Sequence, residues 1–119
     1  MHELSIADAV LRIAVEHAAG RRVAKVELKV GRLRQVVPSA LQFAFELVAR
    51  GTAVEGAELE IEDVEARLAC RACGAETAVD DFPLGCARCG GDFVDVVAGE
   101  ELAVEALELD EEPIPVGRR

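Results

Sequence analysis

The chain has 119 residues, of which 51% are hydrophobic, and this is the length of one domain. No stretch is long and apolar enough to span a membrane, and the first twenty residues lack the charged and apolar pattern of an export signal. The net charge is −10. Residues 1–50 contain eight Lys/Arg and five Asp/Glu, whereas residues 51–119 contain five Lys/Arg and eighteen Asp/Glu. Most of the surface would therefore repel nucleic acid.

The first predicted element is a helix. Ser5 can cap its start and Gly20 can end it. If Ser5 is the cap, residues 1–3 precede the helix and are free to wrap around an ion. His17 falls on the apolar side, where a boundary residue is commoner than a metal ligand; the other residues of that side are Ile6, Val10, Ile13 and Ala14.

A strand is predicted over residues 25–30, where apolar and charged side chains alternate. Its inward residues are Val26, Leu28 and Val30. A basic cluster in and around this strand indicates either a solvated strand face or a docking surface for an acidic protein partner. The cluster consists of Arg21, Arg22, Lys25, Lys29, Arg32 and Arg34.

A second helix is predicted to begin at Pro38, which suits the first helical turn, and to end before Gly51. Its apolar residues recur at helical spacing, which predicts a face that packs on a core. They are Leu41, Phe45 and Val48, with Phe43 and Leu47 broadening the face.

Two more strands follow. One begins at Leu59, and its alternation changes phase at residues 63–64, as a β-bulge would cause. The other covers residues 101–109, with a change of phase at residues 106–107. The acidic, proline-containing and then basic stretch from residue 110 onward predicts a flexible tail.

All four cysteines occur in two pairs, Cys70-x-x-Cys73 and Cys86-x-x-Cys89. Two such turns facing each other form a tetrahedral cage of four thiolates, which suits Zn²⁺. A closed cage has no position for water and therefore indicates a structural metal. Two disulfides or two dithiol redox pairs are the alternatives, but disulfides need an oxidising compartment and the missing export signal favours the cytoplasm.

This order of elements predicts an α+β fold with two helices on one face of a three-stranded sheet, in the order α-β-α-β-zinc loop-β. The zinc loop interrupts the last two strands, so it is an insertion. The predicted divisions are a discontinuous α/β domain of residues 1–67 and 96–109, an inserted zinc-binding domain of residues 68–95, and a tail of residues 110–119.

The amino terminus offers a second set of ligands, Met1-His2-Glu3. The terminal amine, the amide nitrogen of His2 and its imidazole can close fused chelate rings around one ion. The amide nitrogen of Glu3, or a carboxylate oxygen, can complete a plane. Planar nitrogen coordination favours Ni²⁺ or Cu²⁺ over Zn²⁺. An exposed terminal histidine without a metal is the alternative.

Several segments resemble the HypA family of hydrogenase nickel-incorporation proteins. They occur in the family's order and spacing from Met1 to about Leu109. The segments are Met1-His2-Glu3-Leu4-Ser5-Ile6, Val30-Gly31-x-Leu33, Pro38-x-x-Leu41-x-Phe43-x-Phe45, Gly51-Thr52, the two cysteine pairs and Gly99-Glu100-Glu101-Leu102.

The resemblance implies a nickel metallochaperone, which is not an enzyme. Ni²⁺ would be the transported ion and Zn²⁺ a structural one. The implied acceptor is the precursor of the [NiFe]-hydrogenase large subunit, and the implied helper is a HypB-type GTPase. A homodimer is left open. Neither nucleic acid nor a membrane is implied as a partner. The implied ligands are Met1, His2 and Glu3 for nickel and Cys70, Cys73, Cys86 and Cys89 for zinc.

Two departures from the family stand out. Ser39 replaces the acidic residue that usually follows the proline of the second helix, which is Pro38 here. The zinc loop lacks the histidines that some relatives have there. The rival interpretations are a zinc-ribbon module that binds nucleic acid or protein, a metal-dependent enzyme, and a rubredoxin-like iron protein. Residues 70–95 carry two cations against five acids, which disfavours nucleic acid. No set of His, Asp and Glu with an open metal position points to an enzyme.

Overall fold

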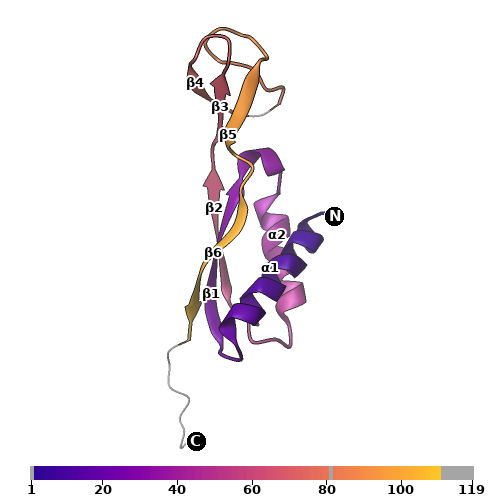
Figure 1. Ribbon diagram of the computed structural model, residues 1–119. Coiled ribbons are helices and arrows are strands. Elements are labelled where there is room, and N and C mark those ends of the chain that lie inside the picture. Colours follow the sequence, from indigo (N-terminus) through magenta and orange to yellow (C-terminus); the bar gives the residue numbers. More distant parts are fainter. Residues whose placement is uncertain (1, 81, 111–119) are drawn as a thin grey trace, which may run out of the picture. The chain divides into compact units, whose positions relative to one another are not determined.

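The computed structural model describes residues 2–80 and 82–110 (Figure 1). Its strands form two three-stranded sheets, in the orders β2-β1-β6 and β4-β3-β5. The α+β class is thereby confirmed. The elements are α1 (His2–Ala18), β1 (Val23–Gly31), the 3-10 helix η1 (Arg32–Arg34), α2 (Pro38–Ala49), β2 (Glu58–Val64), β3 (Ala66–Cys70), β4 (Glu76–Val79), β5 (Val94–Ala98) and β6 (Leu102–Leu109).

The chain forms two compact units. Unit 1 holds the chain up to Glu27, Val37–Glu60 and the chain from Val104 onward, whereas unit 2 holds Leu28–Val36 and Ile61–Ala103. The predicted tail lies outside the described residues except for Asp110, whose N–H donates to the carbonyl of Arg22 at 2.9 Å. No helix among the described residues has the length and apolarity needed to cross a membrane.

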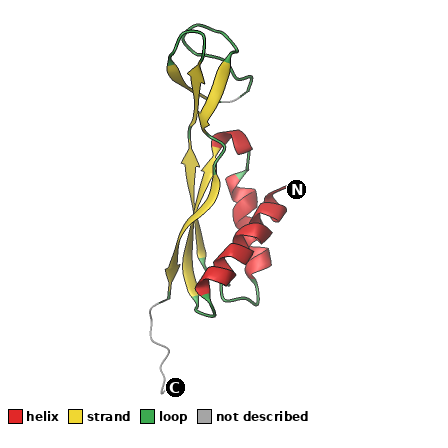
Figure 2. Ribbon diagram, in the orientation of Figure 1, coloured by secondary structure: helices red, strands yellow, loops and turns green. Residues whose placement is uncertain are grey.

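The two helices pack against each other and lie on one face of the sheet β2-β1-β6 (Figure 2). Most of their buried residues are small: α1 buries Ala7, Val10, Ala14 and Ala18, and α2 buries Leu41, Ala44, Phe45 and Ala49. Phe45 is the one phenylalanine that is buried, at 2% exposure. The inward residues predicted for the first strand, Val26, Leu28 and Val30, are all buried, which confirms its phase.

The predicted start of the first helix is wrong. Ser5 does not cap it, because α1 already begins at His2. His2 and Glu3 therefore lie in the first helical turn rather than in a free segment. The predicted end is correct to within two residues, since Ala19 and Gly20 leave the helix with φ of 52° and 86°.

The single bulged strand predicted from Leu59 is also wrong. The chain forms two strands, β2 and β3, which belong to different sheets and are separated at Glu65. The change of phase is real: Leu59 is buried before the break, and Ala66 and Leu68 are buried after it. The alternation shifts because the chain leaves one sheet for another, which gives the side chains a new inner face.

The second sheet was not predicted. Its central strand β3 is antiparallel to both β4 and β5, with Leu68 opposite Thr77 on one side and opposite Val96 on the other. Only β3 contributes buried residues to it, namely Ala66, Leu68 and Cys70, while the residues of β4 and β5 are partly or fully exposed. So small a core cannot hold three strands together without further help.

Three cations of the predicted basic cluster have partners within the protein. Lys25 pairs with Glu60 at 3.1 Å and Arg32 pairs with Asp63 at 2.7 Å. Arg34 Nε donates to the carbonyl of Glu100 at 2.7 Å. These pairings agree with the solvated strand face that the sequence allows, and docking of an acidic partner stays a prediction.

Two glycine-containing segments of unit 2 cross at close range. The N–H of Gly31 donates to the carbonyl of Glu101 at 2.7 Å, and the N–H of Leu33 donates to that of Gly99 at 2.8 Å. A Cβ on Gly31 would overlap the backbone of Gly99, and a Cβ on Gly99 would lie 2.7 Å from Cα of Ala66. Gly99 also has φ of +112°, which L-residues rarely adopt.

We expect Gly99→Ala to lower the free energy of unfolding by about 3 kcal/mol, because backbone strain and the overlap with Ala66 add. Urea denaturation measures it. Gly56→Ala is the matched control, since Gly56 has φ of +80° but open space around its Cβ position. That control isolates the strain and should cost about 1 kcal/mol. Equal losses in the two variants would contradict the predicted overlap.

Candidate metal centres

The four cysteines meet in unit 2 as predicted. All four Sγ atoms lie within 4.8 Å of one another. The distance is 3.7 Å from Cys70 to Cys89 and 3.6 Å from Cys73 to Cys86. A tetrahedral zinc ion with Zn–S bonds of about 2.3 Å requires Sγ–Sγ distances of about 3.8 Å. These two distances are close to that value, so the arrangement of the thiols suits Zn²⁺.

The two cysteine turns have the same backbone geometry. In the first turn, Gly74 N–H donates to the carbonyl of Cys70 at 3.0 Å; in the second, Gly90 N–H donates to the carbonyl of Cys86 at 2.8 Å. Gly74 and Gly90 have φ of 78° and 79°. This left-handed residue after each pair lets the chain turn back around the metal position.

Backbone N–H groups point at the sulfur atoms. Hydrogen bonds from Cys89 and Arg88 lower the pKa of Cys86 to about 6, and one from Cys73 lowers that of Cys70. The N–H of Gly91 also bonds to Cys89, but neighbouring thiols outweigh it and raise the pKa of Cys89 to about 11. Without a metal, the cage thus keeps protons that Zn²⁺ must displace, and zinc affinity should fall as pH falls.

The amino-terminal site is only partly within the described residues, because Met1 lies outside them. The His2 side chain is 53% exposed, and its Nε2 lies 3.4 Å from Oε2 of Glu3. As the first residues of α1, His2 and Glu3 have amide nitrogens with no acceptor one turn earlier in the helix. Those nitrogens can bind a metal ion without breaking a helical hydrogen bond.

Glu3 links the starts of the two helices. Its Oε2 accepts a hydrogen bond of 3.0 Å from the N–H of Val37, the residue that precedes α2. In a capping box, the third helical residue supplies this acceptor. Here that residue is Ala40, which has no acceptor in its side chain, so Glu3 of α1 takes its place. This hydrogen bond also lowers the pKa of Glu3.

We expect Glu3→Ala to increase hydrogen exchange at the Val37 amide by about tenfold, because the start of α2 loses its acceptor. Glu3→Gln keeps a carbonyl oxygen in place and should leave the exchange rate nearly unchanged. Glu16→Ala removes an exposed carboxylate from the same helix and serves as the control. NMR-detected exchange measures all three variants, and a slow Val37 amide in Glu3→Ala would refute this capping role.

The sequence from residue 1 to residue 109 matches the family described as HypA, hydrogenase/urease nickel incorporation, metallochaperone. A hydrogenase maturation factor HypA of Geotalea uraniireducens is 47% identical over 110 residues, covering 92% of this chain and 100% of the relative. One of Nostoc sp. is 40% identical over 111 residues, covering 93% and 97%.

Solved structures show the same fold. A solution structure of a HypA protein superposes with a TM-score of 0.68 at 25% identity, covering 94% of this chain and 98% of the other. The solution structure of the Ni metallochaperone HypA from Helicobacter pylori superposes with a TM-score of 0.63 at 23% identity, covering 90% and 96%.

Proposed function

Because this chain belongs to the HypA family of nickel-incorporation metallochaperones, which are not enzymes, we propose that it binds Ni²⁺ at its amino terminus and delivers it to the precursor of the [NiFe]-hydrogenase large subunit. The observation that supports this best is the position of His2 and Glu3 in the first turn of α1. Their amide nitrogens, the exposed imidazole of His2 and the Met1 amine would form the nickel plane.

We also propose that Zn²⁺ is structural and is held by Cys70, Cys73, Cys86 and Cys89. The Sγ spacing supports a tetrahedral ion, and a closed set of four thiolates provides no position for a substrate. In this view residues 68–95 form the zinc-binding domain, and residues 1–67 and 96–109 form the nickel-binding domain. A HypB-type GTPase would assist delivery in the cytoplasm.

An exposed site at the end of a helix suits transfer. The acceptor can approach a half-exposed His2 and replace the ligands of the ion one at a time. The rival nucleic-acid function lacks support, since Arg71 of the zinc region is held by Asp95 through contacts of 2.9 and 2.6 Å. That pairing leaves Arg88 as the other cation of residues 70–95.

The test is transfer of radioactive nickel. The nickel-loaded chain is mixed with the metal-free large-subunit precursor in the presence of a chelator that captures any released ion. Delivery predicts nickel in the precursor despite the chelator, and loss of that transfer when His2 is replaced by alanine. Nickel recovered only in the chelator would show that the chain does not hand its ion to this acceptor.

A further inference from the structure

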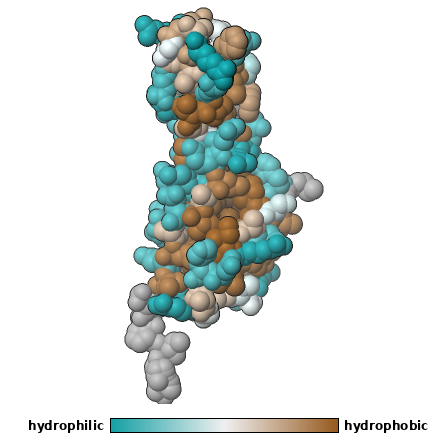
Figure 3. Space-filling view, viewed as in Figure 1, coloured by the Kyte–Doolittle hydropathy of each residue, from teal (hydrophilic) through white to brown (hydrophobic). Residues whose placement is uncertain are grey.

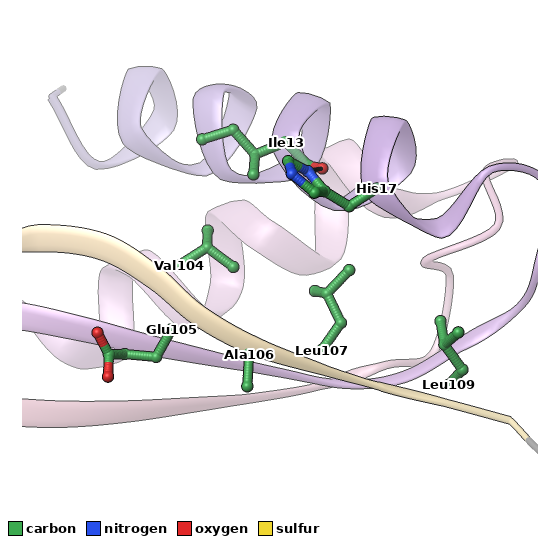
Figure 4. A pocket seen from close by; sticks show the side chains of 7 residues that line it. All are labelled: Ile13, His17, Val104, Glu105, Ala106, Leu107 and Leu109. Atoms are coloured by element: carbon green, nitrogen blue, oxygen red, sulfur yellow. Dashed lines mark hydrogen bonds between the residues drawn. The ribbon is translucent and has the colours of Figure 1, made fainter.

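An apolar groove lies between α1 and β6 in unit 1 (Figures 3 and 4). Its volume is about 400 Å³. Ile13 and His17 of α1 form one side, and Val104, Leu107 and Leu109 of β6 form the other. Ile13 is 41% exposed although it belongs to the apolar side of its helix. Among the described residues, no strand covers this part of α1, and Ile13 is therefore exposed in the groove.

One wall of the groove is the outer strand of a sheet. In the order β2-β1-β6, β6 pairs with β1 on one side and with no other strand on the other side among the described residues. The outer edge of such a strand presents main-chain donors and acceptors that can pair with another extended chain. Hydrogen bonds along the edge and pockets for alternate side chains are the two requirements for strand addition.

We propose that an extended segment of a partner protein adds to the outer edge of β6 as a fourth strand and inserts its alternate apolar side chains into the groove beside Ile13. Its inward side chains would contact Val104 and Leu107, and the helix would cover them from above. The His17 ring forms part of the groove wall (Figure 4), and its Nδ1 donates to the carbonyl of Ile13 at 2.9 Å. In the neutral ring this leaves Nε2 as an acceptor for the partner.

The charge of β6 indicates a cationic segment. The charged residues of β6 are Glu105 and Glu108, and the strand has neither Lys nor Arg. Outward-facing Lys or Arg of the added strand would face these carboxylates. A second copy of this chain is disfavoured at the same place, because two β6 strands side by side would bring like charges together.

This inference does not depend on nickel, since all of the groove residues lie away from the amino-terminal triplet in sequence. It can therefore fail while the proposed delivery function stands. The probe is a fluorescent peptide that alternates valine and lysine and has the eight-residue length of β6. A peptide with glutamate in place of lysine is its charge control. Both are titrated against the full-length chain, with fluorescence anisotropy as the readout.

The valine–lysine peptide should bind at least about tenfold more tightly than the valine–glutamate peptide, and added salt should weaken it. Ile13→Lys should reduce the affinity for the valine–lysine peptide about tenfold, because the new lysine fills the groove and has the same charge as the lysines of the peptide. Val15→Lys is the matched control, because Val15 is 39% exposed on the same helix but outside the groove. NMR shift changes should map to the amides of residues 102–109.

Three outcomes of the peptide titrations would overturn the inference. They are equal binding of the two peptides, equal loss in Ile13→Lys and Val15→Lys, and no binding up to about 1 mM peptide. Dimerisation of the chain through residues 102–109 would assign the groove to a second copy instead. Binding of the peptide only after deletion of residues 111–119 would assign it to the chain's own terminus. Each result therefore supports or rejects a partner strand.

Discussion

Replacing Cys70 by serine should unfold β3, β4 and β5 while α1 and α2 stay folded. Cys70 is buried at the end of β3, and its Sγ lies 3.7 Å from that of Cys89. Besides this cysteine, the strands of the second sheet bury only Ala66 and Leu68. With so little apolar surface removed from water, the free energy of metal binding becomes the free energy of folding for these strands.

The readout is the amide exchange rate of each strand together with the zinc content. Amides of residues 66–70, 76–79 and 94–98 should exchange at least about a hundredfold faster, and zinc should fall from one ion per chain to none. A strong chelator added to the native protein should have the same effect. Amides of α1 and α2 should keep their protection, since their core consists of residues such as Phe45 and Leu41.

Arg71→Ala is the control for this prediction. Arg71 adjoins Cys70 and binds Asp95 through two contacts, but its side chain is 63% exposed. Exposed ion pairs contribute little to stability, so zinc and exchange rates should barely change. A metal-free Cys70→Ser chain whose β3 amides stay protected would show that the sheet has a core of its own.

Most of the correct predictions come from patterns of neighbouring residues in the sequence. The alternation of residues 25–30 predicted which side chains of β1 are buried, and Pro38 predicted the start of α2. The cysteine spacing predicted a four-thiolate cage, because two Cys-x-x-Cys turns that face each other bring four thiolates around one ion. The third strand was also correct, with a predicted start one residue before that of β6.

Contacts between distant residues explain what the sequence did not reveal. The hydrogen bond that joins the starts of the two helices could not be predicted, because Glu3 accepts it from Val37, 34 residues away. β4 and β5 are four and five residues long and have no strong alternation of their own. The crossing of Gly31 and Gly99 is likewise invisible in sequence, although both glycines lie in segments that resemble the family.

Adding one glycine before Met1, or replacing His2 by alanine, should lower nickel affinity by about a hundredfold or more. The extension moves the amine away from the chelate ring, and His2→Ala removes the imidazole. Calorimetric titration of the zinc-loaded chain measures the affinity, because zinc keeps the four thiolates from binding nickel themselves. The planar nickel absorption band should disappear in both variants.

His17→Ala is the matched control for this experiment. His17 is the other of the two histidines in the chain, and it is exposed on the same helix at the opposite end. Nickel affinity and zinc content should both be unchanged in this variant. If the extended protein binds nickel as tightly as the native chain, the terminal amine is not a ligand. If His17→Ala matches His2→Ala, the site is not at the amino terminus.

The role of Glu3 follows from comparing two substitutions in the same titration. Its Oε2 already accepts the hydrogen bond from Val37, so the side chain has a structural task that a metal ion would have to displace. Glu3→Gln keeps both the main-chain nitrogen and an oxygen acceptor for Val37. We therefore expect Glu3→Gln to bind nickel almost as tightly as the native chain, whereas Glu3→Ala should bind it more weakly because the first turn of α1 loses its tie to α2. Equal and large losses in both variants would instead identify the carboxylate as a nickel ligand, and nickel binding would then compete directly with the capping of α2.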